Sequence, residues 1–239
     1  MKTTSMSKPF KLLQLHEKVV SIAFQEKLTL DSVRLKLFLT HEFPALEEVS
    51  TTFNRINLFF KEAVNLVAIN EKLANFDAAD FTRKSSEEYW EIPICLAPQF
   101  TADLLVYFEG KQSAVEDYLA TFLAHTYTLE FYGFLPGFGY MSGLPTNLHL
   151  PRKQNPTRLT NRGTVAVGGA QLGVYPQDSP GGWQGIGYTP VPWFIPKNEP
   201  PVFIQSGDQI RFTSIDLQQC RSIALAVEMG VYQPKKITS

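Results

Sequence analysis

One stretch of fifty-eight residues, from Gly133 to Pro190, constrains the fold more than any other part of the chain. It contains twelve of the fifteen glycines and seven of the sixteen prolines in the 239-residue sequence. Glycine adopts backbone conformations that other residues avoid, whereas proline fixes φ and removes an amide donor. Because the stretch contains no simple repeat, this density predicts loops of defined shape between short strands. Such loops often carry function on a rigid scaffold.

The same stretch is locally basic. It carries four cationic side chains against one acid, Asp178, although the whole chain has a formal net charge of −1. The four cations are Arg152, Lys153, Arg158 and Arg162. This local excess of positive charge indicates a small anionic ligand. The near-neutral charge of the whole chain argues against a nucleic-acid partner, which normally requires a broad basic face.

The composition is that of an ordinary folded protein, with 44% hydrophobic and 19% charged residues, which excludes wholesale disorder. Two cysteines, Cys95 and Cys220, are too few for a disulfide framework. The first twenty residues lack the apolar segment of a signal peptide, and no run approaches the roughly eighteen apolar residues of a membrane helix. These features predict a cytoplasmic protein with no membrane partner.

Hydrophobic periodicity divides the first part of the chain into short strands and helices. Strands are predicted for the segments FKLLQL, VVSIAF, LEEVSTT and RINLFF, and helices for Leu30–Leu39 and Lys61–Phe76. Their order predicts a small α/β sandwich. The polar run Asp77–Glu88 has no periodicity and is the best linker candidate. We therefore predict two domains, residues 1–84 and residues 85–239.

The second part begins with a predicted strand, YWEIPICL, and two predicted helices, Ala102–Phe108 and Ser113–Leu123. Four residues of the second helix share one face and are predicted core residues: Val115, Tyr118, Leu119 and Phe122. From Tyr127 onward, short alternating segments such as GTVAV and DQIRFTSI are separated by glycine and proline turns. This pattern predicts an all-β barrel or sandwich, and so an α+β class for the whole chain.

Several familiar catalytic motifs are absent from the sequence. The glycine cluster is not followed by Lys-Ser or Lys-Thr as in a P-loop, and GFGYMSG does not have the G-x-G-x-x-G spacing. HExxH, CxxC and G-x-S-x-G do not occur either. The four histidines are scattered, so no metal site is predicted. Motifs alone leave the class of enzyme open.

Five phrases occur in a fixed order between Gly133 and Phe212: GFLPGFGY, LPRKQNPTR, GTVAVGGAQLGVYP, SPGGWQGIGYTP and SGDQIRF. Together they resemble the KipI family, also called allophanate hydrolase subunit 1 or the B component of 5-oxoprolinase, of the carboxyltransferase C/D domain type. The amino-terminal half also resembles this family in its layout, including a strand that contains IPIC. The resemblance therefore extends over essentially the whole chain.

The resemblance implies a small amino-terminal α+β domain and a carboxy-terminal cyclophilin-like β-barrel. It also implies a hetero-oligomeric complex with two partners, a KipA-type C component and an A component, which hydrolyses 5-oxo-L-proline to L-glutamate. ATP, with Mg²⁺, is the implied cofactor and would be shared with the KipA-type partner. Two alternatives also follow from the resemblance: inhibition of a sensor histidine kinase, and amide processing of the allophanate hydrolase type.

The chain departs from the family pattern in places. The usual GFPYLGGL reads GFGYMSGL. Two other departures bear on function. The family usually has a histidine about a dozen residues before the FLPGF phrase, where this chain has Phe122, with His125 three residues later. The usual IGRTP reads IGYTP, so that Tyr188 stands where the family has arginine. The first departure bears on catalysis and the second on anion binding.

Five residues of the glycine-rich stretch are predicted to bind substrate or ATP: Arg152, Arg158, Gly168, Gly169 and Trp183. A guanidinium matches carboxylate or phosphate oxygens in two hydrogen bonds, although exposed loop positions would explain both arginines equally well. The glycine amides could form an anion-binding concavity or simply a tight turn. Trp183 could be a substrate platform or a core anchor. Pro136, Phe138 and Tyr140 could line a pocket wall, although packing of the loop on the barrel explains them equally well.

His125 and Gln171 are the candidate catalytic residues. Histidine suits general acid–base chemistry because it titrates near neutral pH, but a structural histidine explains His125 as well. The amide of Gln171 could contact a ligand or brace its own loop. Asp178 could take part in proton transfer or metal binding, or could cap a turn.

Overall fold

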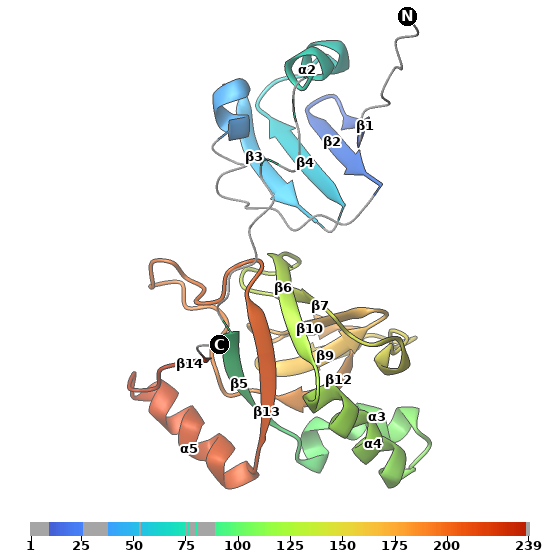
Figure 1. The fold of residues 1–239 in the computed structure, drawn as a ribbon, viewed down its shortest axis with the longest axis vertical. Helices are drawn as coiled ribbons and strands as arrows, with labels where there is room; N and C mark the ends of the chain where they lie inside the picture. Colours follow the sequence, from blue (N-terminus) through green and yellow to red (C-terminus); the bar gives the residue numbers. More distant parts are fainter. Residues whose placement is uncertain are drawn as a thin grey trace, which may run out of the picture. The chain divides into compact units, whose positions relative to one another are not determined.

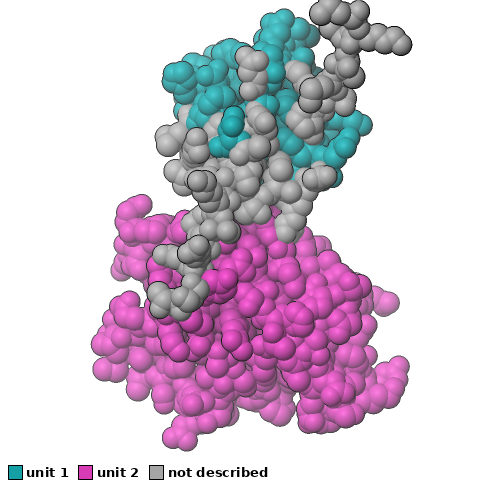
Figure 2. Space-filling model, viewed as in Figure 1, with its two compact units in different colours: residues 1–84 teal, residues 85–239 magenta. Residues whose placement is uncertain are grey.

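The computed structural model describes residues 10–25, 38–52, 54–74, 76, 80 and 89–237. The chain divides into two compact units, residues 1–84 and residues 85–239, which Figure 2 shows in teal and magenta. Each unit contains its own cluster of buried hydrophobic side chains. The predicted linker lies almost entirely outside the described residues, because only Asp80 of the run is described.

Unit 1 is built on a four-stranded antiparallel sheet with the strand order β1-β2-β4-β3 (Figure 1). Its strands are β1 Phe10–His16, β2 Val19–Phe24, β3 Leu46–Thr51 and β4 Arg55–Phe60. All four match predicted strands, and in β2 and β4 alternating apolar residues face the core of the unit.

The two helices predicted for unit 1 had different outcomes. Helix α2, Leu66–Lys72, is shorter than predicted because Asn65 caps it, accepting a hydrogen bond from the Val67 amide at 2.8 Å. Most of the predicted helix at 30–39 lies outside the described residues; its last two, Phe38 and Leu39, are helical.

Unit 2 is a closed barrel of seven strands in the order β12-β9-β10-β7-β6-β13-β5. Its strands are β5 Tyr89–Cys95, β6 Thr126–Tyr132, β7 Gly139–Ser142, β9 Thr164–Gly168, β10 Gln171–Val174, β12 Gln184–Tyr188 and β13 Gln209–Ile215. Pairing of Tyr188 with Cys95 joins β12 to β5 and closes the ring. Strands β13 and β5 pair in parallel, whereas the other neighbours are antiparallel. The predicted α+β class with a carboxy-terminal β-barrel is confirmed.

Three further strands lie outside this ring. Strand β14, Lys235–Ile237, pairs with β5. Strands β8, Thr157–Thr160, and β11, Ser179–Gly181, form a separate two-stranded ribbon. This ribbon belongs to the glycine-rich stretch and forms one side of the candidate site.

Two helices follow β5 at one end of the barrel: α3, Ala102–Tyr107, and α4, Gln112–Leu123 (Figure 1). The four predicted core residues of α4 are all buried. Phe122 packs in the barrel core, where its ring lies 5.1 Å from that of Tyr127 and 5.3 Å from that of Phe212. The predicted helical face is therefore confirmed.

Helix α5, Leu217–Glu228, was not predicted, because the segment after Tyr127 was expected to be all-β. Its start is a capping box: the Asp216 carboxylate accepts from the Gln219 amide at 2.7 Å, and the Gln219 side chain accepts from the Asp216 amide at 2.9 Å. In the described parts of the chain, no helix is both long and apolar enough to cross a bilayer.

Candidate functional site

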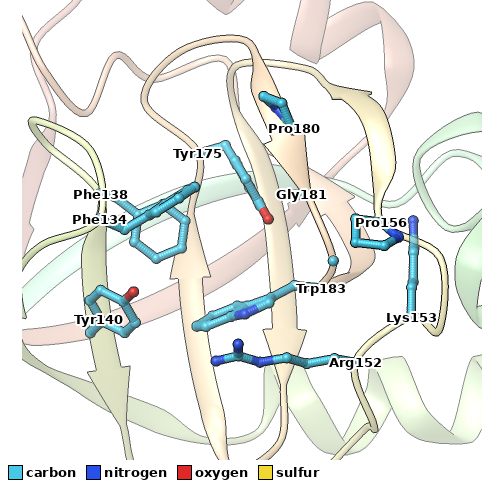
Figure 3. Close-up of a pocket in the computed structure, with 11 residues that line it drawn as sticks. Phe134, Phe138, Tyr140, Arg152, Lys153, Pro156, Tyr175, Pro180, Gly181 and Trp183 are labelled. Atoms are coloured by element: carbon cyan, nitrogen blue, oxygen red, sulfur yellow. The ribbon is translucent and has the colours of Figure 1, made fainter.

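A pocket of about 310 Å³ lies in unit 2, and every residue that lines it comes from the glycine-rich stretch (Figure 3). Strand β7 contributes Tyr140, the segment before β12 contributes Trp183, and Tyr175 directly follows β10. The loop between β6 and β7 contributes Phe134 and Phe138. The pocket is therefore assembled from several turns that the barrel brings together.

Its wall is a cluster of aromatic rings packed edge to face. The ring of Phe138 lies 5.4 Å from that of Trp183 and 5.2 Å from that of Tyr175, both at nearly right angles. Tyr140 meets Trp183 at 5.7 Å. Aromatic rings favour this geometry because a positive ring edge meets a negative ring face. Trp183 is thus both a buried anchor and part of the pocket wall.

Two glycines allow these rings to lie directly on the barrel strands. A Cβ atom at Gly168 on β9 would lie 2.6 Å from three atoms of the Trp183 indole. A Cβ at Gly173 on β10 would lie 2.7 Å from the Phe138 ring. Any side chain at these positions would therefore displace the aromatic wall.

Arg152 is the cation of the pocket that is free to meet a ligand. Its Cζ atom lies 5.7 Å from the centre of the Trp183 ring, and Figure 3 shows the side chain running along the indole with its guanidinium toward Tyr140. No ion pair to Arg152 is found among residues that the structure describes. A guanidinium over an indole is favourable through cation–π attraction, and its remaining donors can bind an anion.

The two tyrosines of the wall remain uncharged near neutral pH. Burial raises the pKa of Tyr140, and the nearby Arg152 opposes this shift. Burial also raises the pKa of Tyr175, against smaller opposing contributions that include hydrogen bonds to Trp183 and Thr160. Because both hydroxyls stay protonated, they can act as hydrogen-bond donors.

Lys153 also lines the pocket, but its charge is paired. Its Nζ atom lies 2.6 Å from Oδ2 of Asp103 and donates to Oγ1 of Thr157 at 3.0 Å. The same Asp103 oxygen accepts the backbone amide of Gly185 at 2.7 Å. Asp103 was not among the predicted site residues, because it lies fifty residues before its partner and no local pattern links the two.

The other predicted binding residues are more dispersed. Arg158 is exposed on β8 and is not among the residues that line the pocket. Gly169 has a φ of +67° in the β9–β10 turn, and its amide donates to the Leu150 carbonyl at 2.7 Å. That amide is therefore already engaged within the protein. Gln171 pairs with Gly168 across this turn and is half-buried outside the pocket lining.

His125 follows α4 and also lies outside the pocket lining. Its Nδ1 atom lies 2.8 Å from the carbonyl oxygen of Thr121, an arrangement that braces the end of the helix. The Asp178 carboxylate accepts the Arg162 amide at 2.7 Å, as expected of a residue that caps a turn.

The two departures from the family pattern that bear on function, Phe122 and Tyr188, both pack against aromatic rings. Phe122 is fully buried among barrel aromatics. Tyr188 stacks on Phe100 with ring centres 4.7 Å apart, outside the pocket lining.

Phe134 stands out among the lining residues. Its φ is +65°, which is unusual for a residue with a side chain, and its side chain is 63% exposed. Such a backbone conformation costs about 1–2 kcal/mol and tends to occur at functional sites. Phe134 and Tyr175 were not predicted, because neither has a local signature beyond an aromatic residue in a glycine- and proline-rich loop.

The lining residues of this pocket are suited to binding an anion. No carboxylate or imidazole is among its lining residues. No group of three or more histidine, cysteine or acidic side chains is placed to hold a metal ion within the described ranges. The combination of one unpaired guanidinium, two tyrosine hydroxyls and an aromatic wall suits a small anion with an apolar body.

Comparison with known proteins places this architecture in a family. Residues 10–204 match the family described as carboxyltransferase domain, subdomain C and D. This chain belongs to that family. It is 37% identical over 155 residues to the 5-oxoprolinase B subunit of Haemophilus influenzae, covering 64% of this chain and 71% of the relative. It is 32% identical over 173 residues to the 5-oxoprolinase B subunit of Escherichia coli O157:H7, covering 72% and 79%.

Solved structures share the fold at lower identity. The urea amidolyase of Kluyveromyces lactis superposes over 100% of this chain with a TM-score of 0.73 and 15% identity. A protein designated TTHA0988 superposes over 83% of this chain with a TM-score of 0.66 and 24% identity. Both are much longer, since this chain spans 17% of the first and 40% of the second.

Proposed function

We propose that this chain is the B component of an ATP-dependent 5-oxoprolinase, which opens 5-oxo-L-proline to L-glutamate. The observation that carries the proposal is its 37% and 32% identity to two proteins named as 5-oxoprolinase B subunits, each covered over more than two thirds of its length. The match to the family over residues 10–204 supports the same assignment.

The chemistry of the pocket is compatible with this substrate. 5-Oxoproline has one carboxylate on a small ring that contains a lactam. Arg152 would bind the carboxylate through its planar donor fork, and the aromatic wall would contact the ring. The Tyr140 hydroxyl would donate to the lactam oxygen, since its raised pKa keeps it protonated.

The reaction requires more groups than this pocket contains. Resonance stabilises the lactam, so phosphorylation of its oxygen by ATP would make the ring carbon more electrophilic. Water would then add to that carbon, the C–N bond would break as the nitrogen takes up a proton, and a second water would hydrolyse the resulting acyl phosphate to L-glutamate and phosphate. The lining residues include no carboxylate or imidazole to activate water, which supports a role for partner proteins. We therefore propose that ATP, with Mg²⁺, is shared with a KipA-type C component. The A component would complete the assembly in the cytoplasm.

A kinase-regulating role is the second candidate. The absence of acidic and imidazole groups from the pocket lining, together with the exposed ring of Phe134, is also what a purely binding protein would have. Such a protein would inhibit autophosphorylation of a sensor histidine kinase without any of these partner proteins.

Reconstitution separates the two candidates. We expect the chain, purified with its C and A components, to release glutamate from 5-oxoproline only when ATP is present. Folded partners that assemble with the chain yet give no turnover would contradict the proposal. Inhibition of a kinase by the chain alone would then favour the regulatory role.

Arg152 provides a test of the pocket that does not depend on turnover. Replacing Arg152 with Gln should weaken binding of 5-oxoproline to the isolated chain by roughly 10- to 100-fold, because a charge-assisted pair is lost. Isothermal titration calorimetry would measure this change in affinity. Arg221→Gln, which removes an exposed cation from α5, is the matched control. Arg158→Gln measures whether that exposed arginine takes part, and an unchanged affinity in Arg152→Gln would exclude this pocket.

A further inference from the structure

The two cations of the pocket, Arg152 and Lys153, differ in whether an acidic side chain already neutralises their charge. The ammonium group of Lys153 lies 2.6 Å from a carboxylate oxygen of Asp103. Figure 3 shows Lys153 extending beside Pro156, away from the Arg152 guanidinium. Arg152 has no such carboxylate partner in the described parts of the chain. The pocket therefore offers a ligand about one uncompensated positive charge, that of Arg152, rather than two.

Asp103 is well placed to keep Lys153 occupied. It lies in the first turn of α3, and its Oδ2 atom also accepts the Gly185 amide of strand β12 at 2.7 Å. The carboxylate is thus anchored to a helix and to the barrel at once. The two charged side chains are only 32% and 21% exposed, so that solvent and salt screen the pair less than a surface pair.

The lysine also lies between two cavities. A smaller, more polar cavity of about 190 Å³ adjoins the aromatic pocket, and both Asp103 and Lys153 line it. Thr157, which accepts from Lys153, lines the same polar cavity. The lysine head group is therefore held by partners on the polar side, while its neighbour Arg152 faces the aromatic side.

Charge matching follows from this arrangement. A carboxylate carries one negative charge and would be neutralised by Arg152 alone. A phosphoryl group carries about −1.5 to −2 at neutral pH, so part of its charge would remain uncompensated against aromatic walls. Placing an unpaired charge beside apolar surface is unfavourable. The paired lysine therefore favours monoanions over phosphates.

We infer that Asp103 is a positioning residue that restricts this pocket to singly charged anions by holding Lys153. The inference deepens the proposed function and rests on it, because it assigns the pocket to the substrate carboxylate. It also assigns the polyphosphate of ATP to a different surface. Asp103 does not line the aromatic pocket, so it acts through Lys153 rather than by contact with the ligand.

The test compares two anions on the isolated full chain by calorimetry, with 5-oxoproline as the monoanion and inorganic pyrophosphate as the multiply charged probe. Asp103→Asn keeps an oxygen that can accept the Gly185 amide but removes the charge that pairs with Lys153. We expect this variant to bind pyrophosphate about tenfold more tightly, and 5-oxoproline within about twofold of the unmodified chain. Combining it with Lys153→Met should abolish the gain.

The control is Asp117→Asn, which makes the same change of net charge on an exposed position of α4. If Asp103→Asn does not fold, Asp103→Ser replaces it, since a hydroxyl can still accept the amide. A gain in affinity for one anion class is an outcome that general structural damage would not produce.

Three results would overturn the inference: no gain for pyrophosphate in a folded Asp103 variant, a gain that survives Lys153→Met, or an equal gain in Asp117→Asn. Failure of the role inferred for Asp103 can be distinguished from failure of the proposed function. A clear shift in anion preference without glutamate release by the reconstituted complex would contradict only the proposed activity. Glutamate release with no shift would contradict only the role of Asp103.

Discussion

At the scale of single residues, the pocket depends on glycines, which leave room for the aromatic rings because they have no side chain. Gly168 has no Cβ, and the Trp183 indole occupies the space where that atom would lie. The adjacent Gly169 serves a different purpose, because its φ of +67° suits the turn while nothing lies within 4 Å of a Cβ there. Gly168 is therefore required for packing of the Trp183 ring, whereas Gly169 is required for the backbone conformation of the turn.

This difference gives a paired prediction. Gly168→Ala should displace Trp183, weaken binding of 5-oxoproline by at least about tenfold and lower stability by roughly 1–3 kcal/mol, the usual cost of overpacking. Gly169→Ala should cost about 1–2 kcal/mol through its left-handed backbone, yet leave the indole in place. Tryptophan fluorescence, thermal unfolding and calorimetry would measure both variants. Equal losses of binding in the two would contradict the role given to Gly168.

At the scale of elements, α5 shows a helix fixed mainly by its ends. Only Cys220 of its twelve residues is fully buried, so core packing contributes little to the helix. The capping box of Asp216 and Gln219 satisfies two amides that would otherwise have no partner in the helix. Local hydrogen bonding therefore carries much of the stability of this element.

Removing the cap should loosen α5. We expect Asp216→Ala to lower the free energy of unfolding by about 1 kcal/mol, equivalent to roughly 2–4 °C in Tm for a protein of this size. Circular dichroism and calorimetry would measure the change. Ser222→Ala is a control on the same helix, because the Ser222 hydroxyl only donates back to the Gln218 carbonyl. If the two variants were equally stable, the cap would not be what holds α5.

At the scale of the whole molecule, buried tyrosines link the stability of the barrel to alkaline pH. Burial raises the pKa of Tyr118, Tyr127 and Tyr132 above the ordinary value of 10.0. Tyr127 donates to the Phe122 carbonyl and Tyr132 to the Ile204 carbonyl, both at 2.8 Å. The folded chain therefore holds these protons at a pH where the unfolded chain releases them.

The sign of the pH dependence follows from this difference. Stability should be complete below the unfolded pKa of about 10 and should fall as pH rises above it, by up to about 1.4 kcal/mol per pH unit for each tyrosine. Urea unfolding between about pH 9 and about pH 11 would measure the slope, and Tyr127→Phe should reduce it. A stability that is constant over this range would contradict the prediction.

Much of the fold could be predicted from local patterns. The four strands of unit 1, strands β5, β9 and β13 of unit 2 and the buried face of α4 followed from periodicity, because each depends on neighbours within a few residues. The pattern left a barrel or a sandwich open for unit 2, and the family resemblance implied the barrel. The capping box of α5 was equally local, as an aspartate three residues before a glutamine, and could have been recognised. The boundary of α2 depended on the Asn65 side chain, a signal that a periodic pattern does not contain.

The candidate site was only partly predictable. Arg152 and Trp183 were singled out and do meet in one pocket, whereas Arg158, Gln171 and His125 lie outside its lining. All of these residues except His125 belong to the glycine-rich stretch, but strand register decides which side of the barrel each residue of a strand faces. A residue close in sequence to one that lines the pocket can therefore face away from the pocket.

By itself, the sequence determined where glycine and proline allow tight turns, and hence where aromatic rings can lie on bare strands. Only the tertiary structure decided that Asp103 meets Lys153 and that Phe122 fills the barrel core. The physical reason is closure of the ring through Tyr188 and Cys95, ninety-three residues apart in the chain. Pairing over such separations depends on the register of every intervening strand, and no local pattern contains that information.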